Sequence, residues 1–222
     1  MTDFTTKPRK YYADRLWNYP TGAGLPSGFT ARWATTNISW SVQAETADGA
    51  PSDKEIKATI TLAGHYAVSF DRAGQRANVD ALVLVLAPGT SGTSSHGGVA
   101  IRISGSAGSE NAYTASLRSS AGAASSLRLM KLVAGTETQI AVHSLTWTAN
   151  TWYYIRLRSF GTSLKSKIWA LGSAEPSSWQ IDTTDSDVTG AGYCGIYVRH
   201  AGTNPAISYI AVSQNFAAPR VA

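Results

Sequence analysis

Hydrophobic and polar residues alternate along two neighbouring stretches of the chain. In the segment 151–159, every second residue from Tyr153 to Leu157 is apolar, and the residues between them are cationic or aromatic. After a short polar turn at Gly161, the alternation resumes over 163–170. Successive side chains of a strand point to opposite faces of its sheet, so this period of two indicates two half-buried antiparallel strands.

Similar patterns recur along the whole chain, separated by turn-forming Gly, Pro, Asp and Ser residues. No segment keeps apolar residues at helical spacing. Residues 81–87 (ALVLVLA) are continuously apolar, as in a strand that is buried on both faces. The pattern predicts an all-β fold, a two-sheet antiparallel jelly-roll sandwich of about 12–14 strands. The expected strands are 29–34, 37–44, 54–62, 66–70, 78–87, 98–104, 111–118, 126–133, 137–143, 151–159, 163–170, 193–200 and 206–213.

The 222 residues fit a single large β domain, and neither a linker nor an internal repeat divides them. Residues 1–28 are rich in aromatic, Pro and Gly residues and show no strand alternation. We expect them to form an irregular N-terminal arm that packs on the sandwich edge or reaches a partner subunit. Residues 29–222 are expected to form the jelly-roll domain.

The net charge of +5 reflects a scarcity of acidic residues, since only KPRK at 7–10 groups positive charge. Nucleic-acid binding is therefore not expected. No run approaches the roughly 18 apolar residues of a membrane span, and MTDFTTKPRK lacks the apolar core of a signal peptide. We expect synthesis in the cytoplasm, with no secretory export and no membrane insertion. The lone Cys194 excludes an intrachain disulfide and is expected to be a buried apolar residue.

The acidic residues lack the spacing of a glycoside hydrolase, which needs two carboxylates about 5–9.5 Å apart. No Glu has an acidic residue at i+2 or i+4 within a strand, and Asp71 and Asp80 lie singly at strand ends. The histidines are scattered, and the loop GTSGTSSHGG (89–98) lacks the Lys-Ser/Thr ending of a phosphate-binding loop. We therefore predict that the protein is not an enzyme. The residues considered are Glu45, Glu55, Glu110, Glu137, Glu175, His65, His96, His143 and His200.

Asp182, Asp185 and Asp187 form the densest acidic cluster, in the segment IDTTDSDV. One interpretation is a turn, because Asp, Ser and Thr side chains hydrogen-bond to their own backbone. The alternative is a calcium site, for which oxygen-rich loops are suited. Two observations favour the turn: the spacing is not that of an EF-hand, and the last strand, AISYIAVSQ, carries no acidic residue. No other cofactor is expected.

Cationic and aromatic residues occupy the positions opposite the aliphatic ones on several strands. If these strands are neighbours, one sheet face carries Arg and Lys interleaved with rings. Rings stack on sugars, and Arg forks bind carboxylates or phosphates in pairs. The alternative is an ordinary solvated face with cation–π contacts. The candidate glycan-binding residues are Arg102, Trp152, Arg156, Arg158, Lys167, Trp169 and Arg199.

Six motifs follow one another through the second half of the chain: GVAIRISGS (98–106), ENAYTASLR (110–118), LRLMKLVAG (127–135), TWYYIRLRSFGTSLKSKIW (151–169), EPSSWQ (175–180) and DSDVTGAGYCGIYV (185–198). Their order resembles the concanavalin A-like, LamG-type jelly roll, in the version common in bacteriophage virion proteins. The resemblance covers roughly residues 29–213. The matched positions are architectural in that group, so the resemblance implies a fold and a setting but no catalytic residues.

The resemblance implies a non-enzymatic component of the virion exterior, in a tail, a fibre or the head surface. Such a protein would bind host-surface polysaccharide or lipopolysaccharide and would contact other virion proteins. Phage fibres are often trimeric, which favours a homotrimer. One alternative is a purely structural decoration or adaptor subunit attached through residues 1–28. A polysaccharide-degrading enzyme is the third possibility.

Overall fold

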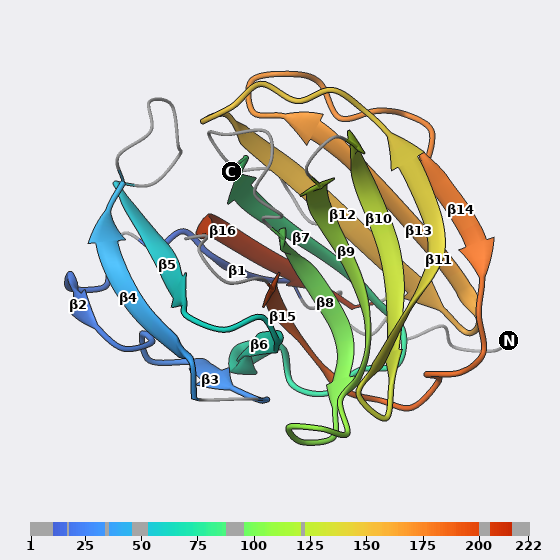
Figure 1. Ribbon diagram of the computed structural model, residues 1–222, viewed down its shortest axis with the longest axis horizontal. Helices are drawn as coiled ribbons and strands as arrows, with labels where there is room; N and C mark the ends of the chain where they lie inside the picture. The colour runs from blue at the N-terminus through green and yellow to red at the C-terminus, as the bar shows by residue number, and fades with distance from the viewer. Residues whose placement is uncertain are drawn as a thin grey trace, which may run out of the picture.

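The computed structural model describes residues 11–16, 18–33, 36–45, 53–87, 96–120, 123–199 and 205–214. These residues form two antiparallel sheets that lie one over the other as a sandwich (Figure 1). The predicted fold class, an all-β two-sheet jelly-roll sandwich, is confirmed. No helix of the described part is long and apolar enough to cross a membrane.

The larger sheet, sheet A, consists of Tyr11–Asp14 (β1), Gly22–Ala23 (β2), Ile38–Ala44 (β4), Lys54–Ile60 (β5), Val79–Leu86 (β7), Trp152–Phe160 (β12), Ser163–Ala170 (β13), Ile181–Thr184 (β14) and Ala206–Ser213 (β16). Their order is β14-β13-β12-β7-β16-β5-β4-β2, and β1 pairs with β16. Sheet A therefore places β12 and β13, the two alternating stretches, side by side with β7.

The smaller sheet, sheet B, consists of Phe29–Ala31 (β3), His65–Phe70 (β6), His96–Ser104 (β8), Asn111–Ser120 (β9), Ala123–Val133 (β10), Thr136–Ser144 (β11) and Tyr193–Arg199 (β15). Their order is β11-β10-β9-β8-β15-β6-β3. One short 3₁₀ turn, Asp71–Ala73, follows β6. The sheet brings β3, near the N-terminal end, beside β6 and close to β15, which lies more than 160 residues later in the chain.

Three apolar clusters hold the sandwich together. The main core lies between the sheets, and smaller clusters lie on the outer face of each sheet. Strand β7 serves two of them, because Val83 faces the main core while Leu82 and Leu84 join the cluster outside sheet A. The prediction that residues 81–87 are buried on both faces is confirmed for every residue except Leu86, which is partly buried. Full burial of a Leu side chain contributes roughly 1.5–3 kcal/mol, so the outer clusters add stability that simple alternation does not suggest.

Every predicted strand is present, with ends shifted by at most three residues. Three short strands were missed: β1, β2 and β14. The expected irregular arm contains two short strands, since β1 adds to sheet A beside β16 and β2 pairs with β4. Leu16 is buried, and the Tyr19 ring packs edge-on against Phe29 at 6.3 Å. These contacts order a segment whose own sequence carries little strand signal.

Cys194 is fully buried, as predicted, and burial raises the pKa of its thiol to about 12. Several sequence features lie outside the described residues: KPRK at 7–10, most of the glycine-rich loop (89–95) and His200.

Candidate functional site

Five of the seven candidate glycan-binding residues lie together on the outer face of sheet A. They belong to β12 and β13, where Arg156 is opposite Lys167 and Tyr154 is opposite Trp169. The Tyr154 and Trp169 rings stack with centroids 5.2 Å apart. The predicted gathering of cations and rings is therefore present in part. The five are Trp152, Arg156, Arg158, Lys167 and Trp169.

Acidic side chains neutralise this cationic group. Asp80 of β7 is fully buried, 3.5 Å from the Arg156 Nε and in hydrogen bonds with Arg158 at 2.5 and 2.8 Å. Glu175 pairs with Arg156 and lies 2.7 Å from the Lys167 Nζ. Burial raises the pKa of Asp80, and the two arginines oppose that rise.

The connection from β13 to β14, residues 171–180, contacts the same side chains. The Trp179 ring centroid lies 4.8 Å from the Arg158 guanidinium carbon and 4.7 Å from the Lys167 Nζ. Lys167 also donates a hydrogen bond to the Pro176 carbonyl at 2.7 Å. Trp152, Arg156, Lys167 and Trp169 are consequently buried. The prediction of an open cationic face is wrong for sheet A, because Asp80, Glu175 and the Trp179 ring occupy that face.

Arg102 lies apart from this group and is also buried. It is at an irregularity of β8, where the register shifts between Ile101 and Ser104, and its φ is +56°. Its guanidinium donates hydrogen bonds of 2.6–2.7 Å to the carbonyls of Ala77, Val188 and Gly161. Arg102 is therefore a structural connector rather than part of a sheet face.

Arg199, on β15, belongs to a charged group on the outer face of sheet B. Glu137 pairs with both Arg199 and Arg118 and accepts a hydrogen bond from the Tyr197 hydroxyl at 3.0 Å. His65 lies beside Tyr197, and burial together with Arg199 lowers the pKa of His65 to about 4. The imidazole is neutral at pH 7. The seven candidates thus occupy three separate places.

The three candidate metal ligands do not converge. Asp182 pairs with Lys165 at 2.7 Å, whereas the Lys131 ammonium lies 2.7 Å from Asp185 and 2.5 Å from Asp187. Asp185 also accepts a backbone hydrogen bond from Asp187 at 2.9 Å, which is the predicted turn arrangement. The described chain contains no group of three His, Cys, Asp or Glu residues that could hold a metal ion. The Lys131 ammonium therefore contacts two of the three carboxylates that the sequence suggested as calcium ligands.

A polar hollow of about 330 Å³ lies on the outer side of sheet B, between β3, β8 and β15. Its lining includes one cation, Arg32, and one aromatic ring, that of Tyr193, and neither is among the candidates predicted from the sequence. The Arg32 guanidinium carbon lies 3.6 Å from the centroid of the Tyr193 ring. Tyr193 occupies the outward phase of β15, so alternation could have indicated it; no local signal pairs it with Arg32. The lining residues are Ala31, Arg32, Gln75, Ile103, Ser104, Gly105 and Tyr193.

Arg32 is held firmly at the hollow. Its Nε donates to the Ser69 hydroxyl at 2.6 Å and its Nη2 to Asp71 Oδ1 at 2.7 Å. Burial alone would raise the pKa of Asp71, but hydrogen bonds from Ser69, Thr30 and Arg32 bring it below its usual value. The stacked, hydrogen-bonded guanidinium is a pre-organised donor.

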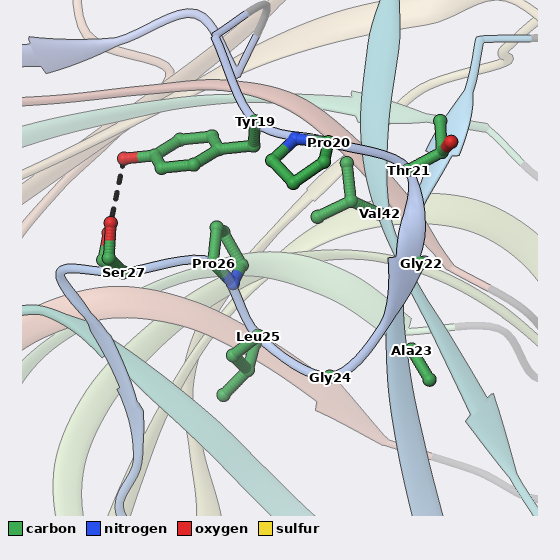
Figure 2. A pocket seen from close by; sticks show the side chains of 10 residues that line it. All are labelled: Tyr19, Pro20, Thr21, Gly22, Ala23, Gly24, Leu25, Pro26, Ser27 and Val42. Carbon is green, nitrogen blue, oxygen red and sulfur yellow. Dashed lines mark hydrogen bonds between the residues drawn. The ribbon is translucent and has the colours of Figure 1, made fainter.

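A second hollow, of about 490 Å³, is enclosed by the loop from Tyr19 to Ser27 and by Val42 (Figure 2). The Tyr19 hydroxyl closes the loop through hydrogen bonds to the Ser27 carbonyl at 3.1 Å and to Asp14 at 2.7 Å. Burial and Asp14 raise the pKa of Tyr19 to about 12. The described lining is uncharged and includes two prolines, Pro20 and Pro26. It offers apolar contact but few groups that would orient a polar ligand.

No protein-family profile matches the chain, and no curated protein sequence matches it. Solved structures do. Carbohydrate-binding module CBM66 from Bacillus subtilis is 18% identical, with 85% of this chain and 92% of that chain covered and a TM-score of 0.53. The CBM2 module of the evolved Dit of Lactobacillus casei BL23 phage J-1 is 10% identical, with 92% and 96% covered and a TM-score of 0.53. A carbohydrate esterase of Shiga toxin-encoding bacteriophage phi24B is 14% identical, with 85% and 90% covered and a TM-score of 0.52. These likenesses establish the fold.

Proposed function

We propose that this protein is a non-enzymatic carbohydrate-binding protein whose binding site is the hollow beside Arg32 and Tyr193. The observation that carries the proposal is the pre-organised Arg32 guanidinium, stacked on Tyr193 and lining a polar hollow. Structures described as carbohydrate-binding modules share the fold, which supports the proposal. The predicted face on sheet A is a weaker candidate, since its cations are already paired.

The hollow suits a sugar by size and by chemistry. Its volume of about 330 Å³ lies at the lower end of the range for ligand pockets, which is enough for one or two sugar rings. Gln75 and Ser104 add polar groups on the rim, while Ile103 and the Tyr193 ring offer apolar contact. A sugar ring presents both hydroxyls and an apolar face, so such a mixed lining matches it.

Tyr193→Ala is expected to weaken glycan binding by at least about tenfold, because aromatic anchors commonly dominate binding energy and because Tyr193 holds Arg32 in place. The measurement is a glycan array followed by calorimetric titration of the best ligand. Phe160→Ala removes an aromatic ring that is 58% exposed at the β12–β13 turn and serves as the matched control. Equal losses in the two variants, or full binding by Tyr193→Ala, would place the site elsewhere.

We propose that binding occurs without turnover. Three strand or loop carboxylates that could serve a hydrolase are engaged in ion pairs: Asp80, Glu137 and Glu175. A carboxylate engaged in ion pairs is not positioned to exchange a proton with a substrate or to attack it. Incubating the protein with its array ligands and analysing the products by mass spectrometry tests this. Any cleaved or deacetylated product contradicts the non-enzymatic assignment.

We propose that the protein works on the exterior of a bacteriophage particle, in a tail, a fibre or the head surface, as a homotrimer that binds host polysaccharide or lipopolysaccharide. The motif order and a phage-derived structure of the same fold support this setting. Immunogold labelling of purified particles tests the location, and light scattering coupled to size-exclusion chromatography tests the trimer. Labelled particles whose protein binds no glycan would favour the alternative, a decoration subunit attached through residues 1–28.

A further inference from the structure

We infer that the hollow beside Arg32 prefers an acidic sugar, one that carries a carboxylate or a phosphate. This inference rests on the proposed function and names the ligand class of the same site. Its basis is the arrangement of Arg32 and Asp71: the cation lines the hollow, whereas its counter-ion does not.

Asp71, the counter-ion of Arg32, is not among the residues that line the hollow. Asp71 Oδ1 accepts hydrogen bonds from Ser69 and from Arg32, and Oδ2 accepts one from Thr30 at 2.5 Å. Both oxygens of the carboxylate are thus engaged, and the carboxylate does not line the hollow. The charged group that the hollow presents to a ligand is therefore the Arg32 guanidinium.

Arg32 retains donor capacity beyond its hydrogen bonds with Ser69 and Asp71. Its Nε and Nη2 are used by Ser69 and Asp71, while its Nη1 donates to no described residue. A quarter of the side chain (25%) is exposed. A guanidinium with a free edge binds the two oxygens of a carboxylate or phosphate better than a single hydroxyl.

Arg32 is the only charged residue in the described lining of the hollow. Ser104, Gln75 and Tyr193 can contact hydroxyls of the same sugar. An acidic ligand therefore gains a charge-assisted contact without facing a carboxylate. The protein's net charge of +5 acts in the same direction at long range.

The test compares oligogalacturonate with its methyl ester, which keeps the sugar backbone and removes the charge. Calorimetric titration of the wild type is expected to give at least about tenfold tighter binding of the acid form. Arg32→Gln is expected to abolish that difference, because it weakens binding of the acid form by more than binding of the ester form. Arg32→Lys, which keeps charge but not the fork, should retain only part of the preference.

Arg72→Gln is the matched control, since the Arg72 side chain is 57% exposed and does not line the hollow. It should keep the acid preference. The inference is overturned if the wild type binds both forms equally, or if Arg32→Gln keeps the preference while its thermal unfolding shows a folded protein. If the wild type binds both forms equally and Tyr193→Ala loses binding of the ester, the proposed function still stands. Failure to bind either form, together with a blank glycan array, overturns both.

Discussion

Replacing Arg102 with alanine is expected to lower the free energy of unfolding by about 4 kcal/mol. Only 1% of the residue is exposed, and its guanidinium serves three backbone carbonyls, those of Ala77, Gly161 and Val188. Leaving a buried acceptor without a partner costs about 1–3 kcal/mol. Water that enters the space left by the side chain recovers part of this cost for the three carbonyls. Since a domain of this kind is stable by about 5–15 kcal/mol, the variant should unfold at much lower denaturant concentration.

Urea unfolding followed by fluorescence provides the measurement, with Arg72→Ala as the control. Arg72 is 57% exposed, so its truncation should change stability by less than about 1 kcal/mol. Arg102→Lys should recover little, because one ammonium cannot reach three carbonyls with the geometry of a planar fork. Comparable stability of Arg102→Ala and Arg72→Ala would show that the three carbonyls are satisfied by other means.

The alternation of apolar and polar residues predicted the positions of the strands well, but it predicted less well which face of a sheet each side chain occupies. Arg102 illustrates the reason. A strand's backbone requires successive side chains to point to opposite sides, so a period of two survives in any fold that uses the strand. At Arg102 the ladder register shifts and φ becomes positive, so the side chain no longer follows the phase of its neighbours. No residue near Arg102 indicates this bulge in the sequence. The prediction that Arg102 belongs to a glycan-binding sheet face was wrong for that reason.

Burial of the predicted face on sheet A had a different cause. The phase of Arg156 and Lys167 was correct, and β12 and β13 are neighbours as the turn at Gly161 implied. What could not be read from the strands is that Glu175 and Trp179, in the following connection, return to contact them. Whether a polar face meets water or a loop depends on the path of a connection that has no periodicity.

The hollow on sheet B lay beyond local sequence reasoning. Arg32 and Tyr193 are separated by more than 160 residues. Arg32 directly follows β3, and the sheet order brings β3 near β15, the strand of Tyr193, only through β6. Tyr193 was detectable as an outward-facing ring, but its partner depended on the topology. Sites of this kind need the strand order first, and that order is set by non-local pairing.

The second large effect is expected at Asp80, where Asp80→Ala should lower the free energy of unfolding by about 3–5 kcal/mol. The substitution removes an acidic partner from the buried Arg156, which keeps its pair with Glu175, and from Arg158. Removing one member of a buried ion pair is costly in this range because the other charge remains buried. Asp182→Ala is the matched control: its side chain is 56% exposed and pairs with Lys165, so about 0–1 kcal/mol is expected. Equal losses in the two variants would contradict the argument.

The pH dependence of the difference in unfolding free energy between wild type and Asp80→Ala tests this explanation. Burial raises the native pKa of Asp80 above the unfolded value, so the native state takes up a proton more readily there than the unfolded state does. The Asp80 contribution to stability therefore becomes more favourable as the pH falls through its native pKa. The difference in unfolding free energy between wild type and Asp80→Ala should widen as the pH is lowered from about 7 towards about 4, the usual pKa of an aspartate. A difference that narrows over this range would mean that the arginine pairs outweigh burial, and that the pKa of Asp80 is lowered rather than raised.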